Sequence, residues 1–205
     1  FLPRHCGICE PVADVEPDPL QGGCQLRCVA PSCQRRVNAC PVEHVILGDL
    51  AAELIVRRDD GHEARLPAGH FFRDEASFTG LEHAALARCD GCVLDIGTGA
   101  GSPCLVLQRR GLRVTAIDIS PQAVGIARAR GVTDARCADV MAFDGGPFDT
   151  LLMLGHGIGM VETIDGLRAF LTKAGTLVAP AGQLLLDSMD AGATADPAHL
   201  AYHAA

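Results

Sequence analysis

A short stretch of the chain combines one acid with three glycines at alternate positions, a combination suited to holding a small charged ligand. The acid is Asp95, and the glycines are Gly97, Gly99 and Gly101. Glycine tolerates the tight turn of such a loop and leaves backbone N–H groups free to face a ligand. A carboxylate beneath the loop would repel a pyrophosphate but attract an ammonium group. The stretch therefore predicts a site for a ligand that carries a positive charge.

The residues around this loop predict a buried strand before it and a helix after it. The strand Val93–Ile96 is apolar apart from its acid, and Ser102 and Pro103 suit a helix cap and a first turn. Strand, glycine loop and helix form the cofactor-binding unit of open α/β sheets. A dinucleotide motif would have glycine at position 102, where this chain has serine. A nicotinamide-dependent oxidoreductase is therefore the weaker interpretation.

The stretch Val93–Pro103 resembles motif I of the class I S-adenosylmethionine-dependent methyltransferases. The match continues, in the family's order, through Val114–Ser120, Cys137–Phe143, Phe148–Leu154 and Pro180–Asp187. The resemblance implies an α/β fold with a doubly wound, mostly parallel, Rossmann-like sheet. It also implies S-adenosyl-L-methionine, or its product S-adenosyl-L-homocysteine, as the cofactor, with methyl transfer as the activity.

The resemblance assigns roles to three acids at successive strand ends. Asp95 and the glycine loop would hold the amino-acid tail of the cofactor, and Asp118 would accept both ribose hydroxyls. Ile119 would pack on the adenine, and Asp139 would bind its amino group beside the Val140 N–H. A single acid after a strand is often only a helix cap, but three on one edge favour a binding site. The predicted cofactor residues are Asp95, Gly97, Thr98, Gly99, Gly101, Asp118, Ile119, Asp139, Val140 and Leu154.

One histidine is a candidate general base. His156 follows the fourth predicted strand, where the family places residues on the acceptor side, and imidazole titrates near neutral pH. A histidine that only lines the pocket is an equally good interpretation. The Asn/Asp-Pro-Pro-aromatic sequence of methyltransferases that act on nucleic-acid bases is replaced here by Leu154-Gly155-His156-Gly157. We therefore expect a small-molecule acceptor, with a protein side chain as the alternative.

The chain has ten cysteines, of which six fall in the first 40 residues. Close pairs of thiolates can supply the tetrahedral ligands of zinc, although only the first pair has the common spacing. The candidate zinc ligands are Cys6, Cys9, Cys24 and Cys28. A proline-rich leader whose cysteines bind nothing is the alternative. A second pair, Cys89 and Cys92, is expected to form a turn rather than a redox site. Arsenite methylation is a further, weaker alternative.

Four segments are predicted along the 205 residues. They are a Cys/Pro-rich accessory segment (1–42), a β-hairpin lead-in (43–74), the methyltransferase core (75–190) and a short Ala-rich tail (191–205). The hairpin is predicted from two short strands around Asp59-Asp60-Gly61. Phe71 and Phe72 are expected to pack in a core, or alternatively to cover a substrate pocket.

Alternating apolar runs and glycine-ended helical segments predict the elements of the core. Helices are expected at 75–88, 104–110, 121–131 and 163–178, and strands at 112–119, 135–140, 148–154 and 183–188. Class I methyltransferases usually continue with a helix and two more strands, for which the tail is too short. We expect either that those last two strands are missing from this sequence or that the sheet is completed another way. An edge left unpaired would favour the alternative of a non-catalytic or degenerate cofactor- or metal-binding domain.

The composition excludes several classes of protein. The net charge is −8, and no block of basic residues suits a nucleic-acid backbone. No apolar run approaches the roughly 18 residues of a membrane span, and the first residues do not resemble a signal peptide. We expect a cytoplasmic protein with no nucleic-acid or membrane partner, whose thiols are free or bound to metal.

Overall fold

The computed structural model describes residues 25–29, 53–57, 63–155, 157–161 and 163–188, and the single residues 190, 193, 195 and 197. For 25–29, 53–57 and 63–64 the backbone is described. The candidate zinc ligands Cys6, Cys9 and Cys24 and the candidate base His156 lie outside the described residues, and Cys28 lies in a strand described by its backbone.

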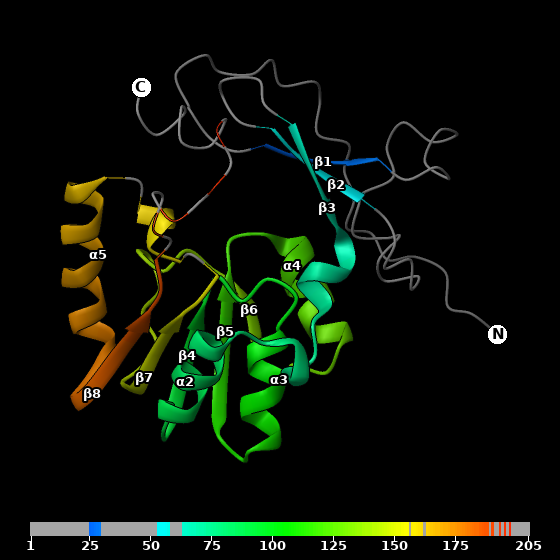
Figure 1. Cartoon of the computed structure of the whole chain (residues 1–205). Helices are drawn as coiled ribbons and strands as arrows, with labels where there is room; N and C mark the ends of the chain where they lie inside the picture. Colours follow the sequence, from blue (N-terminus) through cyan, green and yellow to red (C-terminus); the bar gives the residue numbers. More distant parts are fainter. Residues whose placement is uncertain are drawn as a thin grey trace, which may run out of the picture.

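Five parallel strands form the central sheet (Figure 1). They are β4 (Cys92–Ile96), β5 (Arg113–Asp118), β6 (Ala135–Cys137), β7 (Phe148–Met153) and β8 (Val178–Leu186). Their order is β6-β5-β4-β7-β8, so the chain runs outward from β4 in one direction and then returns to its other side. This reversal beside β4 is the switch point where open sheets bind ligands. The predicted doubly wound parallel sheet is confirmed.

Helices cover both faces of this sheet, because neighbouring strand residues point to opposite sides. On one face, Val93, Ala116 and Leu152 pack with α2 (Gly80–Arg88), α3 (Ser102–Arg109) and α4 (Pro121–Ala129). On the other face, Leu94 and Leu151 pack with α5 (Ile164–Leu177). Asp95 shares the side of Val93, so its side chain points toward α3 rather than α5.

Of the two predicted serine caps, one is present in the structure and one is not. Ser120 caps α4 as predicted, accepting the Ala123 N–H at 3.2 Å. The predicted cap at Ser102 is wrong, because Gly101 at a φ of 76° is the cap residue and Ser102 is the first residue of α3. Its hydroxyl donates instead to the Phe71 carbonyl at 3.3 Å and accepts from the Arg130 guanidinium at 2.9 Å.

Three predicted elements have different bounds. The predicted helix 75–88 is a 3-10 turn, η3 (Glu75–Ser77), followed by α2, because Thr79 and Glu82 form a capping box that starts a new helix. The strand predicted at 135–140 ends at Cys137. The chain turns there, and the Asp139 carboxylate accepts the Met141 N–H at 2.9 Å. The strand predicted at 183–188 begins at Val178, because α5 leads directly into β8.

The segment before the core forms a small antiparallel sheet. The predicted hairpin is present as β2 (Glu53–Arg57) and β3 (Glu63–Pro67), and a third strand, β1 (Gln25–Val29), pairs with β2. A 3-10 helix, η2 (Ala68–Phe72), then leads to the core. The expectation that Phe71 and Phe72 pack in the core is wrong. Phe71 is exposed, and Phe72 is half-buried, with its ring centre 5.1 Å from the guanidinium carbon of Arg130.

None of the helices in the described part of the chain combines the length and apolar character of a membrane span. Within the described residues, β8 pairs with β7 and stands at the edge of the sheet.

Candidate functional site

The carboxylate of Asp118 joins the end of β5 to the glycine loop that follows β4. One carboxylate oxygen accepts the Gly99 N–H at 2.9 Å, and the other accepts the Ser120 N–H at 2.8 Å. Two acids predicted from separate strand ends, Asp95 and Asp118, thereby lie on either side of one loop. The structure brings them together at the carboxyl edge of the sheet, where a ligand of an open α/β fold binds.

The glycine loop closes against β5 rather than presenting free donors. The Gly97 and Thr98 N–H groups donate to the Ile117 carbonyl at 2.9 and 3.1 Å, and the Gly101 N–H donates to the Thr98 carbonyl at 2.9 Å. The expectation that these N–H groups face a ligand is therefore wrong, because two of them donate to β5 and the third donates within the loop. The loop instead leaves open space for a ligand at Gly99. A Cβ added at Gly99 would meet no atom within 4 Å.

Asp95 is a buried acid with a thiol partner. Its side chain is 3% exposed, and the Cys104 thiol, fully buried at the start of α3, donates to it at 2.9 Å. The Thr98 hydroxyl lies 3.2 Å from the same sulfur. Burial raises the pKa of Asp95, and the nearby Asp118 charge raises it further, whereas the bonds to Cys104 and Thr98 lower it. A cationic ligand above the loop would favour the charged carboxylate.

The site residue that sequence reasoning missed is Cys104. Cys104 belongs to no motif. Its role depends on the first turn of α3, which brings its thiol within hydrogen-bond distance of the Asp95 carboxylate. The other close pair also differs from a reactive thiol site. Cys89 and Cys92 are both free thiols, and burial raises the pKa of Cys89 to about 11. A thiol with so high a pKa is mostly protonated at neutral pH, which agrees with a turn rather than a redox pair.

Large apolar side chains are exposed around the acids at this edge. Ile119, directly after Asp118, is 76% exposed, and Met141 and Met160 are exposed as well. Val140 and Leu154 are half-buried against opposite faces of the core. An exposed isoleucine beside a carboxylate suits a flat ring joined to a sugar, so the residues present fit the cofactor that the sequence predicts.

The segment after β7, which leads to the candidate base, is held by Asp187. The N–H groups of Gly155 and Gly157, on either side of His156, donate to the Asp187 carboxylate at 3.2 and 3.0 Å. This segment follows β7 at the same carboxyl edge as the acids. The position of His156 in the chain thus remains consistent with an acceptor-side residue, and its role stays a prediction.

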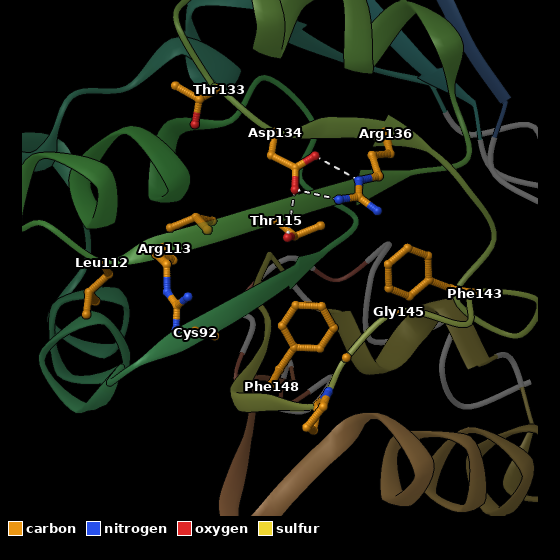
Figure 2. A pocket seen from close by; sticks show the side chains of 13 residues that line it. Cys92, Leu112, Arg113, Thr115, Thr133, Asp134, Arg136, Phe143, Gly145 and Phe148 are labelled. Carbon is orange, nitrogen blue, oxygen red and sulfur yellow. Dashed lines mark hydrogen bonds and ion pairs between the residues drawn. The ribbon is translucent and has the colours of Figure 1, made fainter.

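A hollow of about 540 Å³ lies at the opposite edge of the sheet (Figure 2). Cys92 and Arg113, the first residues of β4 and β5, line it. Asp134 is held there by Arg136 at 2.7 Å and by Thr115 at 2.9 Å. Because this hollow lies at the amino ends of the strands, it is separate from the glycine loop and is not the predicted cofactor site.

Comparison with known proteins decides between the cofactor interpretations. Residues 94–186 match a family model described as a methyltransferase domain. The core of this chain has the class I methyltransferase fold. The matched residues run from β4 to the end of β8 and so include the glycine loop, Asp118 and Asp139. The match favours methyl transfer over the nicotinamide interpretation.

The methyltransferase domain resembles a solved structure from Bacteroides fragilis, a SAM-dependent methyltransferase in complex with S-adenosyl-L-homocysteine. The two share 35% identity at a TM-score of 0.68, over 73% of this chain and 62% of that one. A ubiquinone biosynthesis O-methyltransferase of Xanthomonas euvesicatoria is 32% identical over 139 residues, 64% of this chain and 54% of the relative. A demethylmenaquinone methyltransferase of Tropheryma whipplei is 31% identical over 99 residues, 46% of this chain and 40% of the relative. The chain spans about half the length of these curated relatives.

Proposed function

We propose that this protein transfers a methyl group from S-adenosyl-L-methionine to a small-molecule acceptor. The observation that carries the proposal is the hydrogen bond between the Asp118 carboxylate and the Gly99 N–H. It places an acid beside a glycine loop that has free space at Gly99, within the residues that match a methyltransferase domain. The cofactor, when bound, supplies a sulfonium-activated methyl group. The protein therefore has mainly to bind and orient the two reactants, because proximity and orientation can supply much of the rate.

The acids divide the predicted contacts with the cofactor among them. Asp95 supplies a buried negative charge beneath the loop for the ammonium group. Asp118 keeps capacity for the ribose hydroxyls, because each carboxylate oxygen can accept two hydrogen bonds and each has accepted one N–H. Ile119 packs on the adenine, and Asp139 and Val140 bind its amino edge. The backbone of Gly97, Thr98 and Gly101 and the side chain of Leu154 complete the wall.

The acceptor side is assigned to the segment after β7. His156 acts there as the general base that removes a proton from the acceptor. A small-molecule acceptor is supported by the names of the two curated relatives, which refer to ubiquinone biosynthesis and to demethylmenaquinone. The proposed location is the cytoplasm, where free thiols such as Cys104 remain reduced.

Calorimetric titration of the wild-type protein tests the cofactor assignment. S-adenosyl-L-methionine and S-adenosyl-L-homocysteine should each bind at about one molecule per chain, as expected for a single switch-point site. A nicotinamide dinucleotide, titrated under the same conditions, should not bind. Binding of the dinucleotide with no response to either sulfur compound would contradict the proposal.

The zinc site stays a prediction. No group of three or more metal-binding side chains occurs within the described residues, but three of the four candidate ligands lie outside them. Protein purified without chelator should contain about one zinc per chain if Cys6, Cys9, Cys24 and Cys28 hold the metal. Protein without metal, in which all thiols titrate freely, would favour the leader whose cysteines bind nothing.

A further inference from the structure

Asp187, the first residue after β8, ties down the segment that follows β7. Its two carboxylate oxygens accept the N–H groups of Gly155 at 3.2 Å and Gly157 at 3.0 Å. Its own carbonyl accepts the Ile158 N–H at 3.3 Å, and its N–H donates to the Met153 carbonyl at 3.3 Å. Asp187 thus makes three hydrogen bonds to the segment after β7, two of them charge-assisted, and a fourth to the last residue of β7.

The tied segment depends on such an external partner for its order. Gly155 has a φ of 77°, a left-handed conformation that glycine adopts without strain. Gly157 is buried, and a Cβ there would collide with the side chain of Met153. Glycines lose more backbone entropy on ordering than other residues do, so this segment needs strong hydrogen bonds to stay in one conformation.

The far end of the same segment reaches the glycine loop. Gly157–Val161 forms a 3-10 helix, η4, that carries Met160. The position of a Cβ on Gly97 lies 3.0 Å from the Met160 Cε atom and 3.1 Å from its sulfur. Met160 is 53% exposed and Gly97 is exposed as well, so the Met160 side chain lies against the glycine loop at the protein surface. A continuous set of contacts therefore runs from Asp187, through η4, to the cofactor loop.

We propose that Asp187 is a positioning residue for the donor site, holding residues 155–161 so that Met160 stays against Gly97. Asp187 acts through η4 and needs no contact with the cofactor itself. The inference rests on the proposed function, because a contact between Met160 and Gly97 affects binding only if the donor lies on the glycine loop. Without the hydrogen bonds of Asp187, the segment after β7 becomes mobile in the free protein. Ligand binding then has to order this segment, which costs part of the binding free energy.

The test uses the full chain, with S-adenosyl-L-homocysteine as the probe in calorimetry and amide hydrogen exchange of residues 154–161 as the structural measurement. Asp187→Asn should weaken binding by about 3- to 10-fold, the size expected when a flexible side chain and its loop must be ordered on binding. Exchange should become faster in 154–161 and stay unchanged in α3. Met160→Ala should weaken binding similarly without faster exchange, because the tie remains. Asp144→Asn, at an exposed acid in the connection to β7, is the charge-matched control and should change neither.

The outcomes separate the inference from the function on which it rests. If the wild type binds S-adenosyl-L-homocysteine and Asp187→Asn binds it equally well, Asp187 is not a positioning residue, whatever the change in melting temperature. If the wild type does not bind the probe, the proposed function and the inference both fall. Weaker binding of S-adenosyl-L-homocysteine in Asp187→Asn and Met160→Ala, but not in Asp144→Asn, would establish Asp187 as a positioning residue that acts through Met160.

Discussion

The Asp118 carboxylate and the Gly99 N–H are joined at 2.9 Å, although α3 separates the two residues in the chain. The acid that is predicted to bind the ribose therefore also fixes the loop that is predicted to hold the amino-acid tail. The Gly97 and Thr98 N–H groups, bonded to the Ile117 carbonyl, extend the same attachment. Changes at the end of β5 should consequently affect both halves of the cofactor site.

Asp118→Ala should weaken the binding of S-adenosyl-L-methionine by about 2–3 kcal/mol, because it removes charge-assisted hydrogen bonds to both ribose hydroxyls. This corresponds to a loss of roughly 30- to 150-fold in affinity. Isothermal titration calorimetry measures the change directly. Asp134→Asn, at the opposite edge of the sheet, serves as the control and should bind normally. An unchanged affinity in Asp118→Ala would disprove the assignment.

Cys104 should contribute to stability in a manner that depends on pH. Burial raises the pKa of Asp95, and the Cys104 thiol opposes this effect by donating to the carboxylate. Because the folded state then holds the Asp95 proton more tightly than the unfolded chain, the free energy of unfolding should fall as the pH rises from about 4 toward the raised pKa. Cys104→Ala removes the thiol donor, so the free energy of unfolding should decrease more steeply with rising pH in this variant than in the wild type.

We expect Cys104→Ala to cost about 1.5–3 kcal/mol of stability at pH 8 and less below about pH 4, because the lost thiol donor matters more as a larger fraction of Asp95 becomes ionised. Cys104→Ser keeps a donor at the same position and should lose less at pH 8. Urea unfolding at a series of pH values measures both variants. A loss in Cys104→Ala that is the same at every pH would mean that only packing was removed.

His156→Ala should lower turnover by about 10²- to 10⁴-fold with donor affinity nearly unchanged, if the imidazole is the general base. The wild-type rate should also fall at acid pH as the imidazole becomes protonated. The rates are measured with any acceptor that the wild-type protein methylates, and calorimetry with the donor is the control. A variant that keeps both its turnover and its pH profile would reduce His156 to a residue that lines the pocket.

Two glycines, one buried in the glycine loop and one exposed in α4, provide a matched pair for stability measurements. Gly101 has a φ of 76°, and a Cβ there would lie 2.6 Å from a methyl carbon of Val132. Gly101→Ala should therefore cost about 2–4 kcal/mol from backbone strain and overpacking. Gly125, inside α4, has no atom within 4 Å of an added Cβ, so Gly125→Ala should stabilise by about 0.5–1 kcal/mol. Thermal unfolding should shift in opposite directions. Equal shifts of the melting temperature in the two variants would contradict the assignment of strain to Gly101 and of free space to Gly125.

The sheet and its acids could be predicted because their signals are local. Apolar runs separated by glycine-ended helices predict the parallel strands, and Asp118 directly follows an apolar strand. Asp187 and Cys104 could not be predicted as partners, because their contacts depend on β8 lying beside β7 and on the first turn of α3 lying over Asp95. The donors of the glycine loop were predicted wrongly for the same reason. The carbonyl that occupies the Gly97 N–H belongs to β5.

Arg130 joins parts of the chain that the sequence places in different segments. Its guanidinium donates to the Ala100 carbonyl at 2.6 Å and to the Ser102 hydroxyl at 2.9 Å, and it lies over the ring of Phe72 in η2. The lead-in segment and the glycine loop therefore share one cation, the guanidinium of Arg130. Thermodynamic coupling between two sites is reciprocal. If an ordered η2 strengthens the binding of a ligand at the loop, then binding of that ligand should stabilise the ordered η2 by the same free energy. The lead-in would then report cofactor occupancy without touching the cofactor.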